Sequence, residues 1–126
     1  MKRESMDSQA STTALDGLVQ RLRGFARERD WEQFHSPKNL SMALIVEAAE
    51  LVEHFQWLTE QQSLQLTANK LAAVEQELAD IFIYLIRISD RLGVNLVEAA
   101  WRKIEINERK YPADKVRGKA GKPDDS

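Results

Sequence analysis

The chain has 126 residues, a length typical of one domain, and its 43% hydrophobic and 30% charged residues are typical of a folded globular protein. Its formal net charge of −2 argues against a nucleic-acid-binding protein, which usually carries a basic surplus. It contains no cysteine, which excludes disulfides, thiolate catalysis and cysteine-ligated zinc and fits a reducing, cytoplasmic location.

The two ends of the chain are polar. Residues 1–13 contain no apolar run, so they do not resemble a signal peptide, and we expect a disordered tail there. Residues 113–126 have the same character and are expected to form a flexible tail. No stretch approaches the apolar length that crosses a bilayer, so we expect no membrane partner. Residues 14–112 are therefore expected to form the folded domain.

Two helices are predicted in the first half of the chain, on either side of a non-periodic segment. Apolar residues at helical spacing predict a helix from Leu15 to Arg29. After residues 30–35, Ser36 offers an N-cap and Pro37 a first-turn residue for the second helix. That helix is expected to run from Lys38 to Leu58. Its apolar stripe consists of Leu40, Leu44, Leu51, Phe55 and Leu58.

Two more helices are predicted after a polar stretch. The third spans Lys70 to Leu92, and Gly93 is a natural C-terminal stop. Its apolar stripe consists of Leu71, Val74, Leu78, Ile81, Leu85, Ile88 and Leu92. Asn95 and Glu98 resemble a capping pair for the fourth, which ends near Tyr111. These elements predict an all-α, four-helix-bundle-like fold. Because the third helix is apolar over more than one face, we also expect the chain to self-associate.

Glu47 is the first residue that departs from the apolar pattern. It lies on the stripe of the second helix, one turn after Leu44, where a lone ionised carboxylate is costly. Glu50 follows three residues later, and Glu77 and Asp80 repeat this spacing beside the stripe of the third helix. If the two faces meet, four carboxylates converge, and they repel one another unless they are protonated or neutralised by a cation.

A site made of carboxylates alone favours a hard cation, Mg²⁺ with Mn²⁺ as the alternative, over zinc or copper. Because Mg²⁺ shares its coordination with substrate phosphates, the pattern indicates a phosphate-containing substrate. The alternative is that the acids lie on solvated helix faces and pair with nearby Lys and Arg. Acidic pairs three residues apart are common, so spacing alone leaves both interpretations open.

Four blocks of sequence are similar to those of a known family. They are DWEQFHSPKNL, EAAELVEHFQW, ELADIFIYL and KIEINERKYP, and they occur in order between Leu15 and Pro112. The acidic pairs within them resemble the motif of the MazG-like, all-α nucleoside triphosphate pyrophosphohydrolases. The blocks as a whole resemble the dCTP pyrophosphatase branch of that family.

The resemblance implies an enzyme that converts an NTP or dNTP to the monophosphate and pyrophosphate, with dCTP or a modified pyrimidine dNTP as the expected substrate. It implies Mg²⁺ held by Glu47, Glu50, Glu77 and Asp80, with Glu47 or Glu50 also orienting or deprotonating the attacking water. It further implies a homodimer or homotetramer that removes unwanted nucleotides.

The resemblance also implies a substrate pocket. The matching base-side residues are Trp31, Phe34, His35, Trp57 and Tyr84. The matching polar residues near the phosphates and sugar are Lys38, Asn39, Lys103, Asn107 and Lys110. One departure is visible: Leu22 stands where the animal members carry a His in the first helix. That departure bears on the preferred nucleobase more than on the reaction.

Each of these positions has a structural alternative. Aromatic residues at helical spacing are more often core or interface residues, and the basic residues of the fourth helix could be a solvated face. His54 is expected to be a structural residue or one that supports a ligand, rather than a ligand itself, because it stands four residues after Glu50 rather than the three of di-iron bundles. Four arginines are expected on the surface or in ion pairs: Arg27, Arg29, Arg87 and Arg91.

Two other functions remain open at this level. One keeps the fold and changes the substrate to phosphoribosyl-ATP, as in related hydrolases. The aromatic set at Trp31, Trp57 and Tyr84 argues instead for a simple nucleotide. The other is a non-enzymatic helical interaction module, in which the acids are surface charge.

Overall fold

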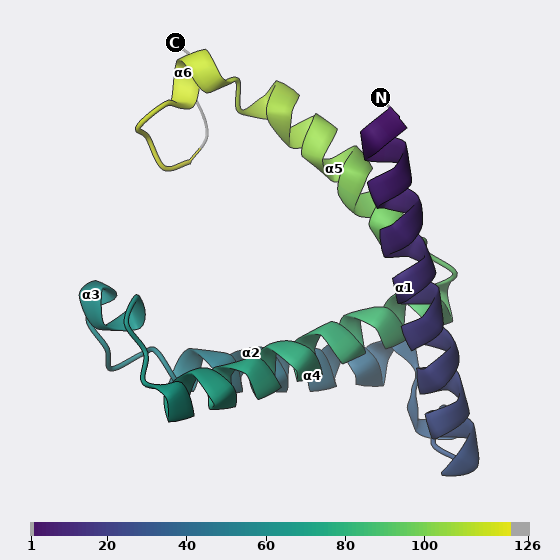
Figure 1. The fold of residues 1–126 in the computed structure, drawn as a ribbon. Coiled ribbons are helices and arrows are strands. Elements are labelled where there is room, and N and C mark those ends of the chain that lie inside the picture. Colours follow the sequence, from purple (N-terminus) through teal and green to yellow (C-terminus); the bar gives the residue numbers. More distant parts are fainter. Residues whose placement is uncertain (1, 122–126) are drawn as a thin grey trace. The chain divides into compact units, whose positions relative to one another are not determined.

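The computed structural model describes the backbone of residues 2–121 and the side chains of residues 14–121. Every regular element in that part of the chain is helical, which confirms the predicted all-α class. The elements, drawn in Figure 1, are α1 (Lys2–Glu28), the 3₁₀ turn η1 (Glu32–Phe34), α2 (Pro37–Glu53), α3 (Glu60–Ser63), α4 (Ala68–Leu92), α5 (Leu96–Lys110) and α6 (Ala113–Val116). The chain divides into two compact units, residues 1–94 and 95–126. Within the described residues, no helix has both the length and the apolar character of a membrane span.

Helix α1 begins earlier than the sequence predicts. The predicted start was Leu15, whereas helical backbone already includes Lys2 and continues to Glu28. The disordered tail expected for residues 1–13 stays a prediction. Residues 2–14 contain neither Pro nor Gly, so nothing interrupts a helix that extends from the apolar stripe toward the N-terminus. The start predicted at Leu15 marks where apolar periodicity begins, not where helical backbone begins.

Helix α2 begins as predicted and ends sooner. The Ser36 hydroxyl accepts a hydrogen bond from the backbone N–H of Asn39, and Pro37 occupies the first turn. The helix ends at Glu53 instead of Leu58, and tighter turns follow it. The reason is local: Thr59 forms a capping box that starts a new short helix, α3, which the sequence analysis did not predict.

Helices α2 and α4 lie antiparallel and side by side, and α1 crosses α4 near the C-terminal end of α4 (Figure 1). Helix α4 starts at Ala68, capped by Thr67, and ends at Gly93 in the left-handed conformation with φ 68°. Glycine adopts that conformation without a Cβ penalty, as the predicted stop requires.

The second unit contains α5 and α6. The Asn95 side chain accepts a hydrogen bond from the backbone N–H of Glu98, which confirms the predicted cap of α5. Helix α6 lies inside the segment expected to be a flexible tail, where Lys115 N–H donates to the carbonyl of Pro112. Pro112 has no N–H and a restricted φ, so it ends α5 and begins this single turn. Residues 122–126 of that predicted tail lie outside the described part.

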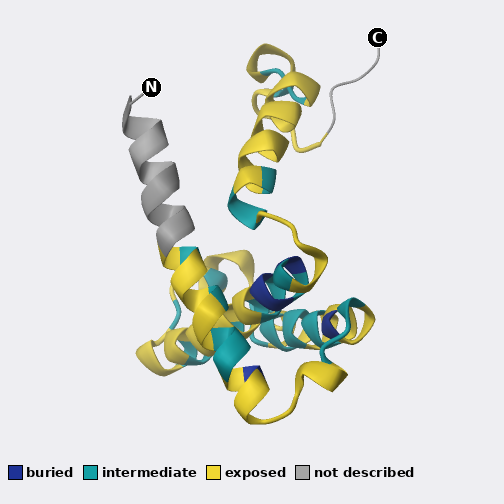
Figure 2. Cartoon of the chain, turned by 90° about the vertical axis from the view of Figure 1, so that its right-hand side faces the viewer, coloured by how far each residue is buried: buried dark blue, intermediate teal, exposed yellow. Residues whose placement is uncertain are grey.

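Few side chains in the described region are fully buried, as Figure 2 shows by colour. The buried apolar residues are Ala26, Leu40, Val74 and Ile86. Much of the apolar stripe predicted on α4 stays about half exposed, including Leu71, Leu78 and Leu92. Exposed apolar residues on α2 include Ile45, Val46 and Val52. The α2–α4 pair therefore leaves considerable apolar surface uncovered within one chain.

Candidate active site

Three carboxylates from α2 and α4 converge. Each of Glu47, Glu77 and Asp80 places an oxygen within 4.8 Å of the others, a separation at which one metal ion could bind all three. Glu47 comes from the face of α2 that packs on α4, and the other two lie one turn apart on α4. The predicted fourth acid, Glu50, is not in this group, but it lies close enough to Glu47 to hydrogen-bond with it.

The electrostatics of this cluster show that it lacks positive charge. The pKa of Glu47 is raised from 4.5 to about 7, first by burial, then by a hydrogen bond with Glu50 and by the charges of Glu50, Asp80 and Glu77. Among the described residues, one buried oxygen of Glu47 and one of Glu77, Oε2 in each, have no hydrogen-bond partner. Buried polar atoms are rarely left unpartnered, so these oxygens fit a site that takes a cation.

One histidine, His54, contacts a carboxylate of this group. His54 Nε2 lies 3.8 Å from Glu77 Oε1, and both side chains are mostly covered. This contact with Glu77 suits the second of the two expected roles, in which His54 supports a ligand. It leaves the second oxygen of Glu77 available within the cluster.

A cavity of about 370 Å³ adjoins the carboxylates. It is lined by Leu22, Phe25, Ala26, Trp31, His35, Glu47, Asp80, Ile83, Tyr84 and Arg87. This volume lies within the usual range of small-molecule sites, and most of the lining is apolar or aromatic with a few polar groups. Burial, followed by the charges of Glu47 and Asp80, raises the pKa of the Tyr84 hydroxyl, which keeps it protonated and able to donate a hydrogen bond.

The wall of the cavity away from the carboxylates is aromatic. Phe25 and Trp31 meet edge to face with ring centroids 5.6 Å apart, and Trp31 meets His35 in the same way at 6.3 Å. Arg29 covers the other side of Phe25, with its guanidinium carbon 3.6 Å from the ring centroid. Three of the predicted base-side residues therefore line this cavity: Trp31, His35 and Tyr84.

Arg87 is the functional candidate that the sequence analysis missed. It was expected on the surface or in an ion pair, but only 4% of it is exposed and it lines the cavity. Its Nη2 lies 3.3 Å from His35 Nδ1, and its Nη1 donates to Asp90 Oδ2 at 3.4 Å. The expected ion pair is present, but the surface position was wrong. A usable signal existed, because Asp80, Tyr84 and Arg87 follow one another at spacings of four and three on one face of α4.

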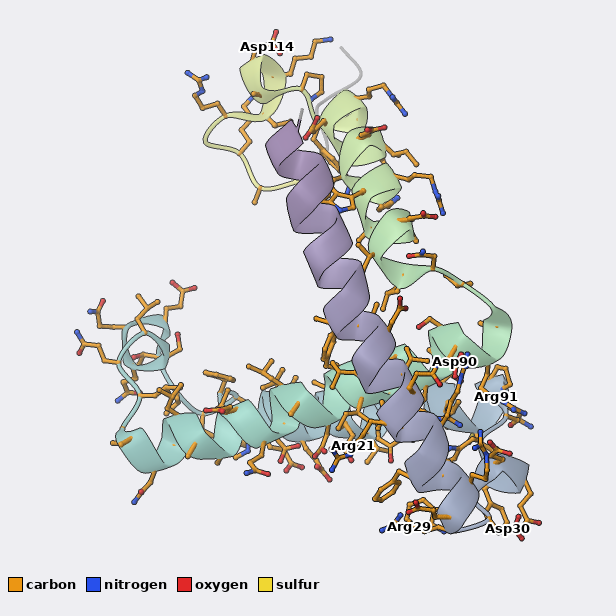
Figure 3. All side chains as sticks on the ribbon, turned by 45° about the vertical axis from the view of Figure 1, so that its right-hand side comes forward. Arg21, Arg29, Asp30, Asp90, Arg91 and Asp114 are labelled. Atoms are coloured by element: carbon orange, nitrogen blue, oxygen red, sulfur yellow. The ribbon has the colours of Figure 1, made fainter. Side chains whose placement is uncertain are left out.

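An ion pair ties α1 to α4 beside this wall. Arg23 donates from two nitrogens to the two carboxylate oxygens of Asp90, with Nε at 2.8 Å from Oδ2. Figure 3 labels Asp90 on α4 where α1 passes it. The Arg23 hydrogen bond, opposed in part by burial, lowers the pKa of Asp90, so this carboxylate is ionised and serves both Arg23 and Arg87.

Four predicted substrate residues from the first unit do not line this cavity. Phe34 and Lys38 are exposed, and Asn39 uses its side-chain amide to donate to the carbonyl of Phe34 at 3.1 Å. Trp57 is 87% exposed in the turns that follow α2. The early end of α2 explains its position, because a helix continued to Leu58 would have kept Trp57 on the acidic line. Their part in substrate binding stays a prediction.

The three predicted residues of α5 belong to the second unit. Lys103, Asn107 and Lys110 are all exposed, and Lys110 lies 5.7 Å from the ring centroid of its neighbour Tyr111. They share one face of α5, as their spacing predicts. Whether they bind phosphates also stays a prediction.

Known proteins with similar sequences indicate the family of this chain. A model of the MazG-like family matches residues 42–124. Two curated proteins, dCTP pyrophosphatase 1 from Bos taurus and from Homo sapiens, are each 44% identical to this chain over 100 residues. The aligned region is 78% of this chain and 59% of each relative. The chain thus spans 59% of the length of the curated relatives it matches.

A solved structure is also similar. The crystal structure of a pyrophosphatase from Archaeoglobus fulgidus superposes with a TM-score of 0.75 at 40% sequence identity, covering 79% of this chain and 93% of that one. At this identity and coverage, the shared architecture extends over nearly all of the archaeal protein.

Proposed function

The chain belongs to the MazG-like family, and we propose that it is a nucleotide pyrophosphohydrolase that adds water across the α–β phosphate bond of a (d)NTP, releasing (d)NMP and pyrophosphate. The observation that carries the proposal is the group of Glu47, Glu77 and Asp80, with two buried oxygens that have no partner in the described part of the chain, beside an apolar and aromatic cavity. Such a cavity suits a base and sugar, and a cation-binding acidic group at its edge suits phosphates.

The carboxylates fit Mg²⁺, with Mn²⁺ as the alternative, because all the ligands are oxygens and carry an excess of negative charge. A bound divalent ion would offset negative charge on the phosphates and lower the pKa of a coordinated water. Glu47, Glu77 and Asp80 would hold it, and Glu50, which interacts with Glu47, is the fourth ligand in this proposal. Glu47 or Glu50 would also orient the attacking water or accept its proton.

The base-side wall favours a nucleotide whose ring stacks on aromatic residues. Trp31 and His35 provide faces and edges for that contact, and Tyr84 provides a hydroxyl between them and the acids. The curated relatives are named for dCTP, which makes dCTP or a modified pyrimidine dNTP the preferred substrate in this proposal. Removal of unwanted nucleotides before polymerases use them is the corresponding role.

Self-association is part of the proposal. Helices α2 and α4 expose Ile45, Val46, Leu78 and Phe82, and this surface suits a second copy of the chain in a homodimer or homotetramer. Sedimentation analysis at several protein concentrations tests it directly. A monomer at every concentration would contradict this part of the proposal and leave the reaction untouched.

The deciding experiment incubates the protein and Mg²⁺ with phosphoribosyl-ATP and a panel of NTPs and dNTPs, with dCTP and modified pyrimidine dNTPs among them, and separates the products by chromatography. We expect a monophosphate and pyrophosphate from the preferred substrate. The Glu47→Gln variant is the matched inactive control, because it preserves side-chain volume and removes the ionisable group. A diphosphate with orthophosphate would contradict cleavage at the α–β bond. Turnover of phosphoribosyl-ATP alone would favour the related hydrolases, and no turnover by a folded protein would favour an interaction module.

A further inference from the structure

The hydrogen bond between Arg87 and His35 determines where the imidazole proton lies. An arginine side chain carries donors and no acceptor, so its Nη2 can only donate to His35 Nδ1, which lies 3.3 Å away. Nδ1 must then be unprotonated, and a neutral imidazole keeps its proton on Nε2. Nε2–H is consequently the one polar group that this ring has left for a ligand, and it is a donor.

The surroundings keep that imidazole neutral. Burial lowers the pKa of His35, and the nearby charges of Arg87 and Arg91 lower it further, with a smaller opposing effect from Glu32. A doubly protonated ring would also place an N–H against the arginine donor. Charge and hydrogen bonding therefore favour the same single form of the ring.

Arg87 is held in the position that this hydrogen bond requires. Its Nη1 bonds to Asp90, which in turn is held by Arg23 from α1. The guanidinium is almost completely buried, and its Nε has no partner among the described residues. An unpaired buried donor is costly, so the placement of Arg87 is not explained by stability alone.

From these contacts we infer that Arg87 is a positioning residue, which presents His35 to the cavity as a hydrogen-bond donor and never as an acceptor. The identity of the ligand rests on the proposed function. A base that turns an unprotonated ring nitrogen to this wall, as cytosine does with N3, accepts from Nε2–H. Uracil and thymine carry N3–H, which would meet a second donor. The chain therefore selects cytosine over uracil through the tautomer of His35.

The first test measures the tautomer itself, without substrate. The chain has two histidines, so ¹⁵N-labelled protein gives two sets of imidazole signals, and the His35→Gln variant shows which set belongs to His35. At pH 7.5, we expect a protonated Nε2 and an unprotonated Nδ1 for His35 in the wild type. A ring protonated on Nδ1, or on both nitrogens, would overturn the inference whatever the enzyme hydrolyses.

The second test compares three arginine variants. Arg87→Met removes the donor and keeps the aliphatic stem, while Arg87→Lys restores a donor and the charge. Arg91→Met is the matched control, because this exposed residue on the same helix also carries charge near His35 but is not its hydrogen-bond partner. Circular dichroism and thermal melts establish that each variant is folded.

The expected results distinguish a role of Arg87 in positioning His35 from a role in packing alone. In Arg87→Met, the imidazole populates both tautomers, KM for dCTP rises about threefold to tenfold, kcat changes little, and the preference for dCTP over dUTP falls by a similar factor. Arg87→Lys recovers part of each change, and Arg91→Met leaves the tautomer and the preference as in the wild type.

A folded Arg87→Met variant with unchanged tautomer and preference would refute the inference. If this variant does not fold, the wild-type spectrum still decides the tautomer. If no nucleotide is hydrolysed at all, the proposed function fails, while the spectra still test the Arg87–His35 contact independently.

Discussion

The charged groups on the two sides of the cavity differ in how they are paired and in the direction in which their pKa values are shifted. On one side, one buried oxygen each of Glu47 and Glu77 has no hydrogen-bond partner among residues 14–121, and burial followed by the neighbouring carboxylates raises the pKa of Glu47 to about 7. On the other side, Arg87 and Arg23 share the carboxylate of Asp90, whose pKa is lowered. Among the described residues, the acidic side has no arginine or lysine partner for its charge, whereas the carboxylate of Asp90 pairs with both Arg23 and Arg87 on the other side. That difference indicates that the acidic side takes a cation and that the basic side is a preformed wall.

One helix carries both sides. Asp80 and Arg87 are seven residues apart on α4, or about 10 Å along its axis, with Tyr84 between them. Because this spacing is two turns, the residues share a face and line one cavity. If the two sides have separate roles, substitutions on the acidic side should lower kcat and substitutions on the opposite side should raise KM or lower stability.

The largest effect is expected at the acidic side. Glu47→Gln removes a carboxylate from the converging group. We expect kcat to fall about a thousandfold or more, because the cation loses a ligand and the attacking water loses the group that orients it or accepts its proton. Pyrophosphate release under saturating Mg²⁺ and dCTP measures it. The control is Glu53→Gln, an exposed glutamate on the same helix, which should leave activity unchanged. Full activity of Glu47→Gln would rule out a metal-binding or catalytic role for Glu47.

A smaller effect on activity is expected at the aromatic wall. Trp31→Ala removes the ring that contacts Phe25 and His35, so we expect KM for dCTP to rise about tenfold while kcat stays within about threefold. Trp31→Phe should recover most of the affinity, because a stacking face remains. Steady-state kinetics separate the two constants. A fall in kcat with unchanged KM would show that this wall takes part in the chemistry and not in base binding.

The ion pair beside the wall should affect stability more than activity. Asp90→Asn removes the charge shared by Arg23 and Arg87, and we expect a loss of about 1–2 kcal/mol, limited by the partial exposure of Arg23. Chemical denaturation measures it. Glu98→Gln, which breaks an exposed pair with Arg102 on α5, should cost less than about 0.5 kcal/mol. Equal effects would show that the Asp90 pair contributes no more than a surface pair.

The smallest expected effect is the pH dependence of stability without metal. Because folding raises the pKa of Glu47 from 4.5 to about 7, the folded state binds the proton more tightly than the unfolded state. Stability therefore falls as pH rises through that window, and the thermal midpoint should drop by a few degrees. Glu47→Gln should flatten this slope, and added Mg²⁺ should raise the midpoint most at pH 7 and above. The lowered pKa of His35 acts in the opposite direction in both proteins, so the comparison with Glu47→Gln is decisive: equal pH slopes for the variant and the wild type would contradict the assigned pKa.

The sequence by itself determined the all-helical class and most helix boundaries, because these depend on local chemistry. Ser36, Gly93 and Asn95 act where the sequence places them, since a cap or a left-handed glycine needs only its own neighbouring residues. The acidic spacing likewise identified Glu47, Glu77 and Asp80, because residues three or four apart share a helix face.

Only the tertiary structure decided which side chains meet. The burial of Arg87, its contact with His35 and the exposure of Trp57 depend on how α1, the η1 segment and α4 pack, and on where α2 ends. Residues 52 positions apart, such as His35 and Arg87, leave no periodic signal in the sequence. Their contact depends on non-local packing, which spacing along one helix does not specify.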